Sequence, residues 1–80
     1  GDPEALLPYY HRLAMNAINQ KNRKRYKDAV RYLKKLRTLY KKLKWEEAWN
    51  RYFELLMEKT KRLRAFQEEV MRGKLIDADR

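Results

Sequence analysis

The clearest hydrophobic pattern in the chain lies between residues 23 and 43. Its apolar side chains recur at steps of three and four residues, in the order Tyr26, Ala29, Leu33, Leu36, Tyr40 and Leu43, with Val30 beside them. At 100° per residue these positions share one arc of a helix, and lysines and arginines occupy the opposite arc. The pattern predicts an amphipathic helix over residues 23–43, with Asn22 as its N-cap.

A second, shorter helix is expected before it. Proline is tolerated in the first turn of a helix and costs about 3 kcal/mol in its interior, so Pro8 favours a start there and leaves residues 1–7 as a lead-in, with a turn capped by Asp2. The predicted helix covers residues 8–20. Its apolar positions share one face and are Tyr10, Leu13, Ala14, Ala17 and Ile18.

A third helix is predicted over residues 45–72. Glu46 and Glu47 suit the positive end of a new helix dipole, which favours a turn at residues 43–45 over one continuous rod. Gly73 is expected to end the third helix in the left-handed conformation. With about 42 Å of length against about 31 Å for its neighbour, its last turns should overhang, and residues 77–80 should form a frayed tail. The inner face comprises Trp49, Phe53, Leu56, Thr60, Leu63 and Val70.

These elements predict an all-α fold with one helical domain over residues 8–76. The second and third helices form an antiparallel hairpin and the first covers one side, which makes a three-helix antiparallel bundle. Tyr26 and Ala29, followed by Leu33 and Leu36, are similar to the second helix of a tetratricopeptide repeat, which implies packing of that kind.

Charge is concentrated in one segment of the 80-residue chain. The net charge is +10, yet residues 21–44 hold twelve Lys and Arg against Asp28 alone. This basic face is either merely solvated or binds an anionic partner, for which phosphate groups are the general candidate. The candidate phosphate contacts are Lys24, Lys27, Arg31, Lys34, Lys35, Lys41 and Lys42.

Catalytic and cofactor chemistry find little support. The chain has no Cys and no Ser, and His11 is its one imidazole, which is expected to pack or lie at the surface. Neither a metal ligand set nor a glycine-rich phosphate loop is present. We therefore expect a protein that is not an enzyme and has no cofactor. No apolar run is long enough to span a membrane, and a cytoplasmic location is expected.

The aromatic residues have two interpretations. They form either a stacking platform beside the basic face or the filling of a small core. Core is favoured for Trp49, Phe53, Tyr26 and Tyr40, whereas both interpretations stay open for Trp45 and Tyr32.

Residues 22–43, followed by Trp45-Glu46-Glu47-Ala48-Trp49 and later by residues 63–69, resemble the C-terminal helical region of bacterial SWIM zinc-finger proteins. The resemblance implies a helical appendage to a zinc-binding module that contacts nucleic acid or protein, in a family associated with helicase-type ATPases. The Cys-x-Cys and Cys-x-His ligands of that module are absent here, so zinc binding does not carry over.

Two functions follow as hypotheses. The first is a non-catalytic interaction domain that contacts a protein partner or another domain of the parent chain, with self-association as a further option. Its expected contacts are Tyr32, Trp45, Phe66, Val70 and Met71. The alternative is an accessory domain that binds DNA or RNA through the phosphate contacts named above.

Overall fold

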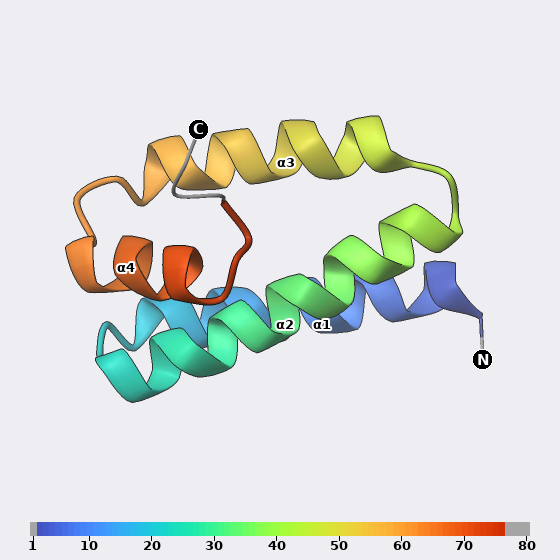
Figure 1. Cartoon of the computed structure of the whole chain (residues 1–80). Helices are drawn as coiled ribbons and strands as arrows, with labels where there is room; N and C mark the ends of the chain where they lie inside the picture. The colour runs from blue at the N-terminus through green and yellow to red at the C-terminus, as the bar shows by residue number, and fades with distance from the viewer. Residues whose placement is uncertain (1, 77–80) are drawn as a thin grey trace.

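Four helices joined by short turns make up residues 2–76, the part of the chain that the computed structural model describes. They are α1 (Pro3–Asn19), α2 (Arg23–Lys42), α3 (Glu46–Lys59) and α4 (Arg64–Arg72). The described residues contain no strand, which confirms the all-α prediction. In Figure 1, α1 and α2 lie side by side, α3 runs back along the other side of the molecule, and α4 lies beneath one end of α3. The predicted tail, residues 77–80, lies outside the described residues.

Helix α1 begins five residues earlier than predicted, so residues 3–7 are not a lead-in. The Asp2 carboxylate accepts a hydrogen bond of 3.0 Å from the backbone N–H of Glu4, and Pro3 occupies the first helical position. Pro8 therefore lies inside the helix, where it removes the bond that its own N–H would make to the Glu4 carbonyl. The Asp2 cap and the favourable Pro3 position offset that loss.

Helix α2 and the turn after it follow the prediction. Asn22 Oδ1 accepts a hydrogen bond of 2.9 Å from the N–H of Arg25, which confirms Asn22 as the N-cap. The chain reverses at Lys44, which has a φ of 61°. The alternative of a continuous helix through this point is therefore excluded.

The predicted third helix is in fact two helices, because the chain turns at residues 60–63. The Thr60 hydroxyl donates to the Leu56 carbonyl at 2.7 Å, and the freed Thr60 carbonyl accepts bonds from the Leu63 N–H and from Gln67 Nε2, both at 2.9 Å. A side chain from α4 thus satisfies the end of α3. The predicted overhang does not exist, because α4 folds back against α2.

The core lies along α2, between α1 on one side and α3 and α4 on the other. The α1–α2 hairpin is the most extensive packing in the fold, not the predicted pair of second and third helices. Ala14, Ala17 and Ala29 are fully buried there, and such small side chains allow two helices to approach closely. On the other side, Phe66 packs against Tyr26 with ring centroids 5.5 Å apart.

An ion-pair cluster joins the start of α2 to α4. Arg23 binds Glu68 and Glu69 at 2.8 Å each, and Arg72 lies 3.7 Å from Glu69. Hydrogen bonding to Arg23 lowers the pKa of Glu68. Only 6% of the Glu69 side chain is exposed, so this carboxylate needs its guanidinium partners.

Gly73 ends α4, but not in the predicted left-handed conformation. Its φ is −79°, and the left-handed position passes to Lys74, whose φ is 62°. Lysines hold that conformation after α1 and α2 as well, at Lys21 and Lys44. The reason for Gly73 is close packing, since an added Cβ would lie 2.5 Å from Cγ1 of Val30.

Candidate nucleic-acid interface

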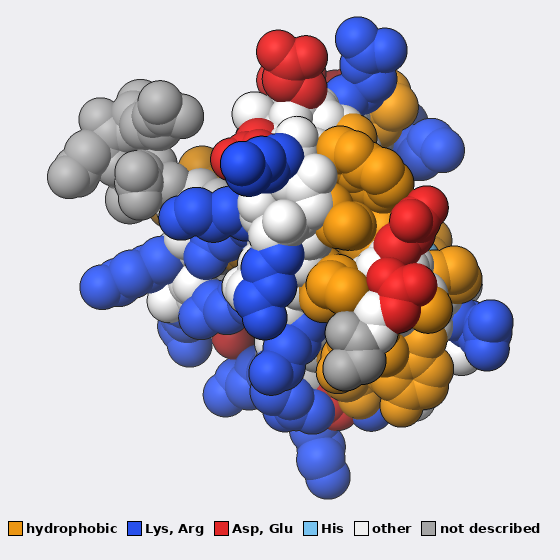
Figure 2. All heavy atoms as spheres, turned by 90° about the vertical axis from the view of Figure 1, so that its right-hand side faces the viewer, with side chains coloured by type: hydrophobic (Ala, Val, Ile, Leu, Met, Phe, Trp, Pro, Cys, Tyr) orange, Lys and Arg blue, Asp and Glu red, His pale blue; other side chains and the backbone are white. Residues whose placement is uncertain are grey.

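The basic face of α2 is fully on the outside of the molecule. All seven candidate phosphate contacts on this helix are exposed, and the helix buries its opposite arc. On the face that Figure 2 shows, most Lys and Arg side chains gather over the left and lower parts, and hydrophobic side chains gather over the right part. The basic face consists of Lys24, Lys27, Arg31, Lys34, Lys35, Lys41 and Lys42.

The acidic residue within this segment does not neutralise the lysines. Asp28 Oδ2 lies 2.6 Å from Nη1 of Arg25, and its Oδ1 lies 3.1 Å from Nη1 of Arg31. Both carboxylate oxygens are therefore engaged by arginines. Within residues 2–76, none of the six lysines of the basic face forms an ion pair. Such a surface produces a strong local positive potential.

A row of aromatic rings leads from the basic face onto α1. The Arg31 guanidinium lies 5.3 Å from the ring centroid of Tyr32. Tyr32 is 6.4 Å from Tyr10, and Tyr10 meets Tyr9 edge-on at 5.1 Å. Tyr10 and Tyr32 are half-buried, whereas Tyr9 is 50% exposed. We call Tyr9, Tyr10 and Tyr32 the tyrosine row.

Of the five residues expected to contact a protein partner, the structure buries some and exposes others. Phe66 and Val70 are 0% exposed and cannot meet a partner, which corrects their assignment. They are buried because α4 folds back on α2. Trp45, in the turn before α3, is 42% exposed, and Met71 is also exposed. Tyr32 lies at the edge of the core and belongs to the tyrosine row.

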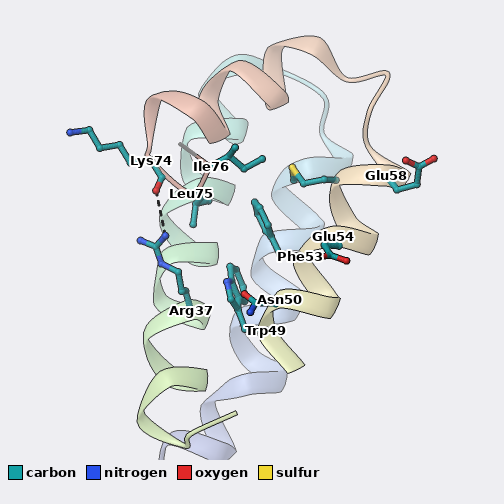
Figure 3. Close-up of a pocket in the computed structure, with 10 residues that line it drawn as sticks. Arg37, Trp49, Asn50, Phe53, Glu54, Glu58, Lys74, Leu75 and Ile76 are labelled. Carbon is teal, nitrogen blue, oxygen red and sulfur yellow. Dashed lines mark hydrogen bonds between the residues drawn. The ribbon is translucent and has the colours of Figure 1, made fainter. Parts of the chain in front are cut away.

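A cleft of about 680 Å³ opens between α2, α3 and the segment after α4, and the sequence did not point to it. Trp49 and Phe53 line one wall, where their rings stack at 5.3 Å (Figure 3). Leu75 faces them, and Arg37 donates a hydrogen bond of 3.4 Å to the Lys74 carbonyl. Trp49 is buried as expected, but Phe53 is only half-buried.

His11 lies in an aromatic cluster between three helices. Its Nε2 and the Tyr40 hydroxyl share a hydrogen bond of 2.9 Å, and its ring meets Tyr52 edge-on with centroids 4.5 Å apart. Burial lowers the pKa of His11 and raises the pKa of Tyr52 to about 12. The imidazole therefore packs among the aromatic rings of this cluster.

Among residues 2–76 there is no group of three His, Cys, Asp or Glu side chains placed to hold a metal ion. None of the helices within the described residues has the length and apolar character that crossing a membrane requires.

Comparison with known proteins finds a relative of the chain but assigns it to no family. No family model matches the sequence, and no solved structure matches it. The chain is 62% identical over 78 residues to the uncharacterized protein YwqB of Bacillus subtilis (strain 168), and the match covers 98% of the chain. The chain is thus homologous to a short stretch of YwqB that makes up 15% of that protein's length.

Proposed function

We propose that this chain is a non-catalytic accessory domain that binds nucleic-acid phosphates through the basic face of α2. One observation carries the proposal: seven cations are exposed on one helix, and the carboxylate among them is already bound by Arg25 and Arg31. This reverses the ranking that the sequence suggested. The protein-contact hypothesis loses Phe66 and Val70 to the core, whereas every candidate phosphate contact stays exposed.

The cations are arranged in two lines along a rigid helix. Lys27, Lys34 and Lys41 are seven residues apart, so they lie in one line at steps of about 10.5 Å. Lys24, Arg31, Lys35 and Lys42 form a second line, about 27 Å from end to end. Phosphates of one strand are about 3.4 Å apart along the helix axis. The length of the basic face, about 27 Å, therefore matches the length of roughly eight consecutive phosphates.

Lysine recognises phosphate as a point charge, so binding of this kind is independent of base sequence. Each phosphate that a cation neutralises releases counterions, and the affinity falls as salt rises. If five of the seven cations engage, the slope of log K against log salt for duplex DNA should be about −4.5. The slope thus counts the contacts.

The test is fluorescence anisotropy with labelled duplex and single-stranded oligonucleotides between 50 and 200 mM salt. The variant Lys27→Glu/Lys34→Glu/Lys41→Glu reverses one line and leaves Asp28 and its arginines untouched. We expect it to lose at least about tenfold in affinity and to show a shallower salt slope.

The matched control is Arg51→Glu/Arg62→Glu/Arg64→Glu, which makes the same change in net charge at exposed positions outside α2. It should retain most of the affinity. Equal losses in the two triple variants would show attraction by net charge alone, and an affinity indifferent to salt would refute the proposal.

The second candidate function is contact with another part of a longer parent protein, which the SWIM resemblance would make a zinc-finger protein. The cleft beside α3 and the exposed Trp45 favour it, because the rest of a protein as long as YwqB could cover both. Trp45→Ala should then weaken binding of the remaining parent protein added in trans, measured by calorimetry. Unchanged binding would exclude Trp45 from such an interface.

A further inference from the structure

Tyr9 has a ring that the core does not explain. Tyr10 and Tyr32 cover the edge of the α1–α2 seam and are half-buried, so packing accounts for them. Tyr9 contributes much less, because half of its surface stays in solvent. Nevertheless Tyr10 supports its ring edge-on at 5.1 Å. Tyr9 thus ends a row of rings that begins at Arg31 on the basic face. Single-strand-binding proteins combine exposed aromatic rings with a positively charged groove.

The row and the basic face also share a residue. Arg31 is held from two directions, by Asp28 at 3.1 Å and by the Tyr32 ring at 5.3 Å. Its guanidinium therefore lies at the boundary between the cations and the tyrosines, with 63% of the Arg31 side chain exposed. The cations of α2 and the tyrosine row lie on two helices that pack closely, because the small residues Ala14, Ala17 and Ala29 are fully buried. A strand whose backbone follows α2 would find aromatic faces along its side.

We propose that the nucleic acid bound here is single-stranded, with a base stacked on Tyr9 while the backbone runs along Arg31 and its lysine neighbours on α2. The inference rests on the proposed function and goes further in naming the partner. In a duplex the bases are paired and stacked on one another, so a ring at the protein surface finds no free base face. An unpaired base offers its face regardless of its identity, and its stacking on an aromatic ring strengthens binding by about 5- to 150-fold.

The decisive probes are two oligonucleotides with the same number of phosphates. One is a thymidine 12-mer, and the other is an abasic 12-mer that keeps the backbone and lacks every base. Binding is measured with the full chain by competition against one labelled strand. The wild-type chain should bind the thymidine 12-mer at least about fivefold more tightly than the abasic one. A duplex 12-mer should bind more weakly per phosphate than the thymidine strand.

The variant Tyr9→Leu removes the ring from an exposed position, and a melting temperature close to that of the wild-type chain would verify that it folds. It should bring the two affinities close together by weakening the thymidine 12-mer alone. The control Trp45→Leu removes another exposed ring, which lies in the turn before α3 and outside the tyrosine row, and it should preserve the difference.

Equal binding of thymidine and abasic strands by the wild-type chain would overturn the inference, as would a duplex that binds as tightly per phosphate as the thymidine strand. So would Trp45→Leu and Tyr9→Leu having equal effects. In each of these cases, salt-dependent binding that requires Lys27, Lys34 and Lys41 leaves the proposed function standing. Failure of every oligonucleotide to bind would overturn both.

Discussion

Replacing Gly73 by alanine tests how tightly α4 is seated on α2. The φ of −79° at Gly73 is one that any residue adopts, so alanine causes no backbone strain there. An alanine Cβ at this position would lie 2.5 Å from Val30 Cγ1, 3.3 Å from the Glu69 carbonyl oxygen and 3.4 Å from Lys34 Cε. Carbon atoms in contact prefer about 3.5–4.0 Å. The overlap with Val30 is therefore at least about 1 Å.

The size of the effect follows from what can move. The Lys34 side chain is exposed at its end, but Val30 is 6% exposed and enclosed by the core. Overpacking of this kind costs about 1–3 kcal/mol. Alanine recovers about 0.4–1 kcal/mol by restricting the unfolded chain. We expect Gly73→Ala to lower the free energy of unfolding by about 1–2 kcal/mol, or to lower the melting temperature by about 4–16 °C.

A double-mutant cycle identifies the clash. Val30→Ala alone removes two buried methyl groups and should cost about 1.5–3 kcal/mol. In Gly73→Ala/Val30→Ala the new methyl group enters the space that Val30 vacates, so the double variant should lose at least about 1 kcal/mol less than the sum. The assay is urea unfolding followed by circular dichroism at 222 nm. Additivity within about 0.5 kcal/mol, or a stabilised Gly73→Ala chain, would refute this reasoning.

Three further predictions concern other parts of the fold. Burial lowers the pKa of His11, so the folded chain takes up this proton less readily than the unfolded chain, and stability should fall as the pH drops below about 6.5; urea unfolding at pH 5.0 and 7.5 should show a smaller difference in His11→Gln. Lys44→Gly should raise the melting temperature by an amount equivalent to about 1 kcal/mol, because φ is 61° there, whereas Lys34→Gly inside α2 should lower it by a similar amount. Arg23→Met leaves the buried Glu69 carboxylate without its closest partner, and hydrogen exchange of the α4 amides should accelerate while that of α1 does not.

Helix α2 was predictable from the sequence because its information is local. Asn22 precedes the stripe, and Leu33 and Leu36 repeat at helical spacing and are fully buried in the structure. The turn at Lys44 was also predictable, from acidic residues placed to start a new helix. One buried position of α2, Leu39, lies outside the predicted stripe.

The break at residues 60–63 was not predictable, since neither Gly nor Pro marks it. It depends on hydrogen bonds that Gln67 supplies from the next helix to Thr60. Burial of Phe66 and Val70 follows from that turn. A threonine whose hydroxyl bonds back to the preceding turn is a weak signal of a helix end. At Thr60 the signal can be interpreted only together with the hydrogen bonds from Gln67.

The candidate site divides in the same way. The lysines of the basic face lie on one helix, so their exposure followed from the position of the apolar stripe. The tyrosine row combines Tyr9 and Tyr10 of α1 with Tyr32 of α2, and these meet only because the hairpin closes with one particular register. From the sequence, Tyr32 could be either a core residue or a stacking residue, and nothing in the sequence marked Tyr9 as a candidate contact.

The turn that separates α3 from α4 also has a consequence for how the molecule assembles. The α1–α2 hairpin joins neighbours in the sequence, whereas Arg23 and Glu69 are 46 residues apart. Closing a long loop costs entropy before any contact repays it, so the hairpin should nucleate folding and α4 should dock last. Helix α2 packs against α1 on one side and against α4 on the other. When the native protein fluctuates, the contact with α4 should open first and expose Tyr26 and Val30. The lysine-bearing arc of α2 would keep its helical shape.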